Sequence, residues 1–197
     1  MLNMPRGISP FSRFVPDYSD PMKLRSWTFL FPLALWICQA AGENPAPLEN
    51  GGFEQGLEGW NVQRGQISTA AEAAHAGQSG LRIAASENAT INSLSIPIEG
   101  AKKYRLQLWI RGLENSHAGA TLSFSDGSRK SMDLENADSF KKALPAGKEW
   151  KVFSFEFTAP EAALFLNLKL GVWPKKDAPA TDTLDIDEVI LAEIPAS

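Results

Sequence analysis

The sequence predicts an all-β fold, a β-sandwich of the jelly-roll type. From residue 48 onward, apolar and polar side chains alternate with a period of two, which is typical of strands buried on one face. Glycine, proline, asparagine and aspartate separate these runs, and no stretch has the period of a long amphipathic helix. Many short strands joined by such turns indicate two packed antiparallel sheets.

The first 41 residues are expected to lie outside this fold. Residues 22–41 begin with two basic side chains, continue with an apolar stretch over residues 27–37 and end in small residues. This is the order of a secretory signal peptide, and the apolar stretch is shorter than the roughly 20 residues of a membrane span. We therefore expect a secreted protein, or one of the periplasm or cell envelope, with cleavage after Ala40 or near Gly42.

Two other fates of this segment stay open. Cys38 could carry a lipid, although the bulky Trp36 and Ile37 before it disfavour that processing, or the segment could remain as an uncleaved anchor. Because a signal peptide begins near its own methionine, Met22 is the expected start. Residues 1–21, which contain four prolines and no apolar period, would then be a disordered, mis-assigned extension. After the signal peptide we expect one domain, which spans residues 46–194.

The expected strands follow one another along this domain. They span residues 80–85, 91–98, 104–111, 118–125, 128–134, 150–158, 163–172 and 184–191. Asp126-Gly127 is a typical hairpin turn between two of them. The alanine-rich residues 68–76 could form a helical turn.

Composition and short motifs exclude several classes of protein. The net charge is −4 and basic residues occur at most in pairs, which argues against a nucleic-acid partner. One cysteine and two histidines permit no internal disulfide and no zinc cluster. The chain has no G-x-S-x-G, phosphate-loop or H-E-x-x-H motif, and His117 is expected in an exposed loop. We therefore expect a protein that is not an enzyme.

Three stretches together carry a resemblance to a known family. They are LENGGFEQGLEGW at residues 48–60, HAGQSGLRI at residues 75–83 and LDIDEVIL at residues 184–191. With the aromatic-bearing strand at residues 104–111 and a tryptophan opening a later strand, the chain resembles carbohydrate-binding modules of bacterial xylanases and cellulases. The resemblance implies a galactose-binding-domain-like jelly roll, a monomer, and a polysaccharide or oligosaccharide as partner. Because structural modules share this fold, an extracellular or envelope module that contacts another protein is the alternative.

The same resemblance implies a structural calcium ion. Calcium takes six to eight oxygen ligands, both carboxylates and carbonyls. The implied ligands are the side chains of Glu54 and Asp187 and the carbonyls of Gly52, His75 and Gln78. Asp185 stays the alternative to Asp187, since both share a face in an unbroken strand. The ion would tie the first strand to the last in a domain without disulfides.

Sugars are bound by aromatic rings with a few planar polar groups beside them, and one strand face has this composition. Its residues are Arg105, Gln107, Trp109 and Arg111. A neighbouring strand that presents Phe165, Asn167 and Lys169 on the same side would complete a shallow groove edged by Trp173. The predicted carbohydrate-binding residues are therefore Arg105, Gln107, Trp109, Arg111, Asn167 and Trp173.

Two alternatives to this groove remain. The face could simply be solvated, and a loop could cover Trp109. Trp60 and Trp150 are expected to anchor the core or loops, as they do in the family that the chain resembles.

Overall fold

The computed structural model describes residues 44–114, 116–145, 147–176, 179 and 181–196. These residues belong to one compact unit, Cys38–Ser197. The expected signal peptide and the extension before it lie outside the described residues. No helix in the described part is long and apolar enough to cross a membrane.

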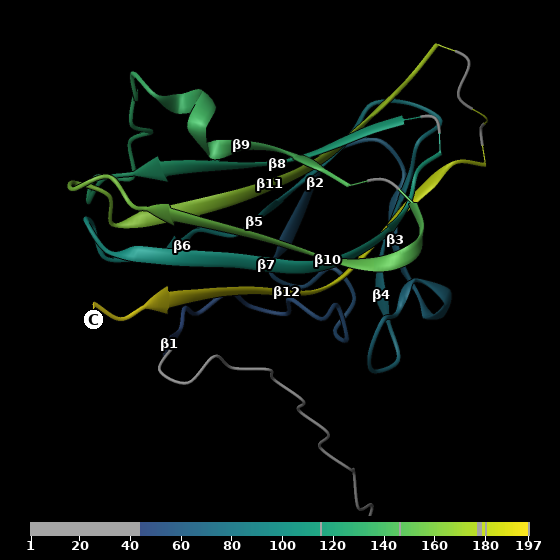
Figure 1. Cartoon of the computed structure of the whole chain (residues 1–197), viewed down its shortest axis with the longest axis horizontal. Coiled ribbons are helices and arrows are strands. Elements are labelled where there is room, and N and C mark those ends of the chain that lie inside the picture. The colour runs from purple at the N-terminus through teal and green to yellow at the C-terminus, as the bar shows by residue number, and fades with distance from the viewer. Residues whose placement is uncertain (1–43, 115, 146, 177–178, 180, 197) are drawn as a thin grey trace, which may run out of the picture. The chain divides into compact units, whose positions relative to one another are not determined.

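Two antiparallel sheets make up the domain (Figure 1). Sheet A has the order β10 (Gly147–Thr158), β7 (Lys103–Gly112), β12 (Thr183–Ile194), β4 (Gly80–Ala84) and β3 (Ile67–Ala70), with β1 (Asn44–Pro45) paired to β12. Sheet B has the order β2 (Trp60–Arg64), β5 (Ala89–Ser93), β11 (Phe165–Pro174), β8 (Ser116–Ser125) and β9 (Lys141–Leu144), with β6 (Ile96–Pro97) paired to β11. The chain crosses repeatedly between the sheets, which confirms the predicted jelly-roll sandwich.

The core lies between the sheets and follows the alternation of the sequence. On β7, Tyr104, Leu106, Leu108 and Ile110 are all buried. On β11 the facing set is Leu166, Leu168, Leu170 and Val172. Because successive side chains of a strand point to opposite faces, the residues between them must point outward. The two outer faces of the sandwich are therefore the places where a ligand can reach strand residues.

The chain ends of the domain meet in sheet A. Asn44 pairs with Glu193 and Pro45 with Ala192, so the first and last strands lie side by side as expected. A β-bulge interrupts β12 between Asp187 and Ile190, and Glu188 within it has a φ of 49°. A bulge re-aims the side chains around it, and here it positions Asp187.

Local expectations were wrong in three places. Residues 91–98 form β5 and β6 separated by a bend, because each half pairs with a different part of β11. Residues 128–134 contribute only one bridge, Ser125 to Ser131, since Asp126 accepts the amide hydrogens of Ser128 and Lys130 and holds a tight turn there. The helical turn expected within residues 68–76 is confirmed as a 3-10 turn, Ala71–Ala73, which follows β3.

The third difference concerns His117. It lies within β8, exposed and opposite Trp173 of β11, and not in a loop. The glycine-containing segment around it reads as a loop in the sequence, but it pairs along its whole length with β11.

Candidate functional site

The single groove expected from the sequence does not form. Arg105, Gln107, Trp109 and Arg111 lie on β7 in sheet A, whereas Asn167 and Trp173 lie on β11 in sheet B. The outer faces of the two sheets point away from each other, so the two sets cannot contact one ligand ring. The prediction was wrong because alternation identifies the outward face of a strand but not its neighbours.

On sheet A, the ring of Trp109 is covered. The imidazole of His75 stacks on it with 3.9 Å between ring centroids and 13° between planes. Trp150 meets the same imidazole edge-on at 5.3 Å, and the Arg111 guanidinium lies 4.6 Å from the Trp150 ring centre. A loop residue therefore occupies a face of Trp109 on which a sugar could stack. Trp60 is buried, and its Nε1 donates to the carbonyl of Asn50 at 3.2 Å.

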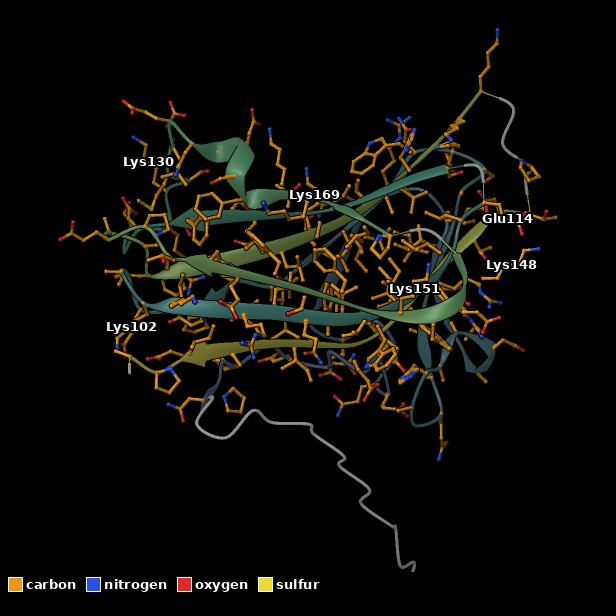
Figure 2. All side chains as sticks on the ribbon, in the orientation of Figure 1. Lys102, Glu114, Lys130, Lys148, Lys151 and Lys169 are labelled. Carbon is orange, nitrogen blue, oxygen red and sulfur yellow. The ribbon has the colours of Figure 1, made fainter. Side chains whose placement is uncertain are left out.

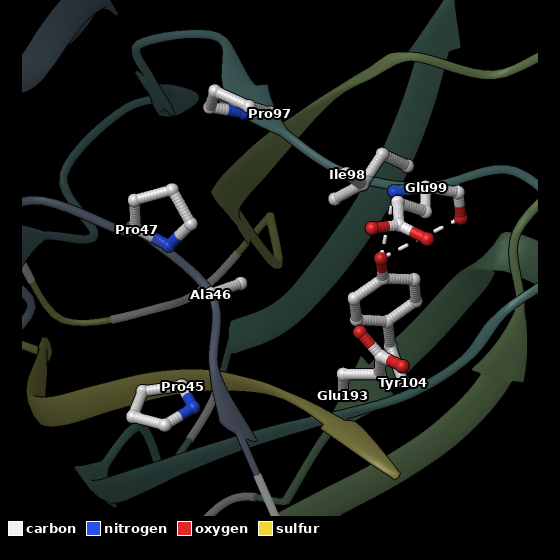
Figure 3. A pocket seen from close by; sticks show the side chains of 8 residues that line it. All are labelled: Pro45, Ala46, Pro47, Pro97, Ile98, Glu99, Tyr104 and Glu193. Atoms are coloured by element: carbon white, nitrogen blue, oxygen red, sulfur yellow. Dashed lines mark hydrogen bonds between the residues drawn. The ribbon is translucent and has the colours of Figure 1, made fainter. Parts of the chain in front are cut away.

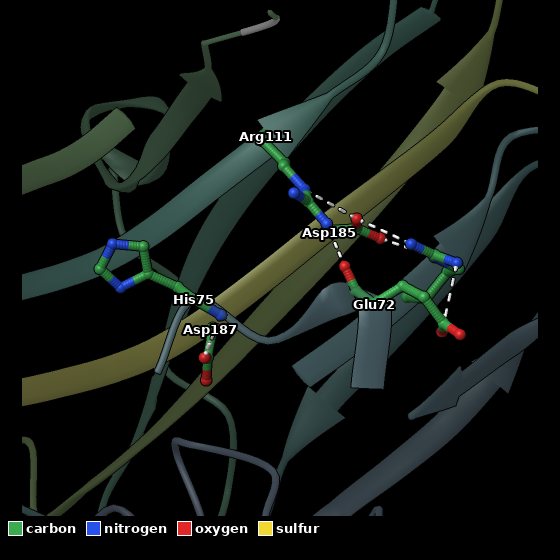
Figure 4. Close-up of polar contacts among 6 residues, drawn as sticks. Glu72, His75, Arg111, Asp185 and Asp187 are labelled. Atoms are coloured by element: carbon green, nitrogen blue, oxygen red, sulfur yellow. Dashed lines mark hydrogen bonds and ion pairs between the residues drawn. The ribbon is translucent and has the colours of Figure 1, made fainter. Parts of the chain in front are cut away.

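The polar groups of this face are engaged with one another. Asp185, which is 4% exposed, accepts from Arg82 at 2.8 Å and from Arg111 at 3.1 Å, and Arg111 also donates to the carbonyl of Glu72 (Figure 4). Arg105 donates to Glu156 at 2.6 Å. The hydrogen bond from Lys103, followed by that from Arg105, lowers the pKa of Glu156. The charged side chains on the outer face of sheet A thus form ion pairs with one another.

Glu54 and Asp187, the two side chains implied as calcium ligands, both contact the loop at residues 75–79. Asp187 is fully buried, and its Oδ2 accepts the amide hydrogen of His75 at 2.7 Å (Figure 4). The same oxygen accepts the amide hydrogen of Ala76 at 3.0 Å. Its Oδ1 accepts the amide hydrogen of Glu188 at 2.7 Å. Burial is the main cause that raises the pKa of Asp187, against the opposing effect of these amides.

Glu54 contacts the same loop further along the chain. Its Oε1 accepts the amide hydrogens of Gln78 at 2.9 Å and Ser79 at 3.1 Å. Gly77 has a φ of 69°, and a side chain there would collide with the Glu54 carboxylate. A Cβ at Gly52 would lie 3.9 Å from Oδ1 of Asp187, so Gly52 in the opening turn lies beside the Asp187 carboxylate.

This set suits calcium in its chemistry. Its members are carboxylate and carbonyl oxygens, the ligands that calcium prefers. Among the described residues no three side chains of His, Cys, Asp or Glu gather into a metal site, so carbonyls would have to supply the remaining ligands. Of the two aspartates left open by the sequence, Asp185 is neutralised by two arginines, while Asp187 has no cationic side chain bonded to it in the described part of the chain.

The ring of His75 has a role that the sequence did not suggest. Its Nδ1 contacts Oε2 of Glu188, the residue in the bulge of β12. The imidazole thereby fastens the loop at residues 75–79 to sheet A over Trp109. No local pattern indicates this contact, because its two partners are 113 positions apart.

On sheet B, Trp173 presents an open ring. It is 39% exposed, and the six-membered ring of its indole lies over Gly119 and Gly171, which are register partners on β8 and β11. A Cβ added at Gly171 would lie 2.7 Å from Cη2 of this ring, and one added at Gly119 would lie 3.1 Å from Cζ3. Two glycines inside strands are the sequence signal for such a close approach. We call Trp173, Gly119 and Gly171 the tryptophan pad.

Polar side chains surround the tryptophan pad on sheet B. A row of register partners crosses five of the six strands and consists of Asn61, Asn92, Lys169, Thr121 and Lys141. Asn167 donates to the carbonyl of Ser93 at 3.1 Å. The buried Oδ1 of Asn92 has no hydrogen-bond partner in the part of the chain that the structure describes. Amides and hydroxyls beside an open aromatic ring are the groups that bind sugar hydroxyls.

A hollow near the first strand is less suited to a sugar. It is lined by Pro45, Ala46, Pro47, Pro97, Ile98, Glu99, Tyr104 and Glu193 (Figure 3). The hydroxyl of Tyr104 accepts the amide hydrogen of Glu99 at 2.8 Å, and its ring is buried in the core. Tyr104 is the one aromatic residue that lines this hollow, and its buried ring offers no face on which a sugar could stack.

Comparison with known proteins identifies the family. A family model described as a carbohydrate binding domain matches residues 46–177. The chain belongs to this family of carbohydrate-binding domains. The matched segment contains the tryptophan pad and ends before β12.

Solved structures share the fold at low sequence identity. A family 16 carbohydrate binding module is 19% identical with a TM-score of 0.56, over 73% of this chain and 97% of that one. A xylan-binding domain of family 22 is 14% identical with a TM-score of 0.52, over 79% and 97%. Part of tailspike protein 4 of bacteriophage CBA120 is 14% identical with a TM-score of 0.63, over 76% of this chain and 22% of that one. No curated protein matches the sequence.

Proposed function

We propose that this carbohydrate-binding domain binds a polysaccharide or oligosaccharide on the outer face of sheet B, without catalysing a reaction. The observation that carries the proposal is the 39% exposed ring of Trp173 on its two glycines. An aromatic ring held against a rigid sheet offers a large apolar surface at little conformational cost. The C–H groups of a sugar ring can pack on that surface while its hydroxyls face the neighbouring amides.

The decisive test compares two tryptophans. Migration through native gels that contain soluble polysaccharides, neutral and charged, would give affinities for the wild type, Trp173→Ala and Trp109→Ala. We expect Trp173→Ala to weaken binding at least about tenfold, the loss of one ring-stacking contact of more than about 1.4 kcal/mol. Trp109→Ala should bind as the wild type does, because His75 already covers its ring.

Melting temperatures of both variants serve as the control for folding. Loss of binding in folded Trp109→Ala, together with full binding in Trp173→Ala, would move the site to sheet A. Absence of binding to every polysaccharide would favour the alternative, an envelope module that contacts another protein.

Two further properties belong to the proposal. The first is a structural calcium ion held by Glu54, Asp187 and the carbonyls of Gly52, His75 and Gln78. The arrangement of both carboxylates around one loop supports it, as does the buried charge of Asp187, which a cation would offset. The second is export directed by residues 22–41, for which the support is the order of basic, apolar and small residues.

A further inference from the structure

The charged residues of this domain are divided unequally between its two sheets. The strands of sheet B contain no aspartate or glutamate, although the chain as a whole has a net charge of −4. They contain four cationic residues, Arg64, Lys141, Lys142 and Lys169. The strands of sheet A instead carry acidic residues, several of them paired with arginine or lysine.

Two of the four cations on sheet B are already engaged. Lys141 pairs with Asp138 at 2.7 Å, and Lys142 lies 4.4 Å from the ring centre of Phe155. Lys169 and Arg64 make no ion pair or side-chain hydrogen bond with any described residue. Figure 2 labels Lys169 on the central strand β11, where its neighbours along the strand, Leu168 and Leu170, point into the core. Lys169 is therefore an unpaired charge in the middle of the proposed binding face.

Both free cations flank the tryptophan pad. Lys169 points outward from β11 two residues before Gly171, which is about 7 Å along the strand from the pad. Arg64 is opposite Thr90, and Thr90 is opposite Gly171, so Arg64 lies about 10 Å across the sheet from the pad. These spans exceed one sugar ring. A chain stacked on Trp173 would bring its neighbouring units to the cations.

Further groups around Lys169 and Trp173 agree with this arrangement. Thr121 flanks Lys169 in its row and can bind hydroxyls. Lys175 and Lys176, which follow Trp173 closely, are exposed. We propose, on the basis of the function proposed above, that the ligand is an acidic polysaccharide, whose carboxylate or sulfate groups contact Lys169 and Arg64 while a sugar ring stacks on Trp173.

The test uses pairs of polymers that differ only in charge. Polygalacturonate and its methyl ester have the same sugar backbone, but only the first carries free carboxylates. Dextran sulfate and dextran likewise have the same backbone, but only the first carries sulfate groups. Binding would be measured by affinity electrophoresis and calorimetry with the exported form of the protein. We expect the charged member of at least one pair to bind at least about tenfold more tightly, and the pair that responds identifies the anionic group.

Raising the salt to about 1 M, where the Debye length is about 3 Å, should remove most of this preference. Lys169→Gln and Arg64→Gln should each weaken binding of the anionic polymer about threefold to tenfold, as expected for an exposed charge-assisted contact. The matched control is Lys151→Gln, an exposed lysine on β10 of the other sheet, which should bind as the wild type does (Figure 2).

Three outcomes would overturn the inference. Equal binding of charged and neutral polymers, still lost in Trp173→Ala, would reject the acidic ligand and leave the proposed function standing. Binding of polyanions that Lys151→Gln weakens as much as Lys169→Gln would show non-specific charge attraction. Absence of binding to all four polymers and to a wider neutral panel would reject the proposed function and the inference with it.

Discussion

Two tryptophans on outward strand faces, Trp109 and Trp173, have different neighbours. Trp109 lies under the imidazole of His75, whereas Trp173 lies over two glycines and keeps 39% of its surface exposed. The difference comes from the neighbours of each ring. On sheet B these are Gly171 of the same strand and Gly119 of the paired strand, whereas on sheet A the neighbour is a loop histidine.

The support beneath Trp173 leads to a prediction for Gly171→Ala. The new methyl group would start 2.7 Å from Cη2 of the indole, so the ring must tilt away from the sheet. We expect sugar affinity to fall about threefold or more with a small change in melting temperature, because an indole can move more easily than backbone can. Gly127→Ala, in an exposed turn, is the control. Unchanged affinity in folded Gly171→Ala would show that the close approach of Gly171 does not position the Trp173 ring.

Asp185 leads to a prediction about stability. It is 4% exposed and accepts hydrogen bonds from Arg82 and Arg111, and the hydrogen bond that Arg82 donates to Asp185 is the main cause that raises the pKa of Arg82. Asp185→Asn would leave two partly exposed arginines without their carboxylate, at a cost of about 2–3 kcal/mol in the free energy of unfolding. Urea denaturation measures it. Glu72→Gln, which removes a carboxylate 4.0 Å from Arg82 and 75% exposed, should cost less than about 0.5 kcal/mol. Equal midpoints for the two variants would contradict this ranking.

At the scale of the elements, the opening turn and the bulge of β12 form one unit. The amide of Val189 donates to the carbonyl of Gly51 at 2.9 Å, and the side chain of Asn50 spans the turn with hydrogen bonds to the carbonyls of Gly56 and Glu58. The turn thus holds the bulge that places Asp187 beside the loop at residues 75–79.

This unit leads to a prediction for Gly51→Ala. A Cβ at Gly51 would overlap the carbonyl oxygen of Val189, which is backbone and cannot rotate away. We expect a loss of at least about 2 kcal/mol in the free energy of unfolding, measured by thermal or chemical denaturation. Gly127→Ala again serves as the control. A variant as stable as the wild type would mean that the turn and the bulge can separate at no cost.

At the scale of the whole domain, calcium would join distant parts of the chain. Its proposed ligands come from the opening turn, the loop before β4 and the last strand, which also pairs with the first. At a calcium concentration 100-fold above the dissociation constant, binding adds about 2.7 kcal/mol of stability. We expect chelation to lower the melting temperature by about 5–10 °C.

Glu54→Gln and Asp187→Asn should abolish the response to chelator, whereas Asp138→Asn, on an exposed turn of the opposite sheet, should retain it. A melting temperature that is the same with calcium and with chelator would reject the ion. That result would leave the proposed sugar surface on sheet B unaffected, because none of the ligands lies in its strands.

The sequence by itself determined the fold class and the buried face of each long strand. The alternation of apolar and polar residues is a local pattern, and it determines which face of a strand is buried. Only the tertiary structure decided that β7 and β11 belong to different sheets, that His75 covers Trp109, and that Gly119 lies beneath Trp173. These contacts join residues far apart in the chain. Their geometry depends on register and sheet order, which the local period of the sequence does not specify.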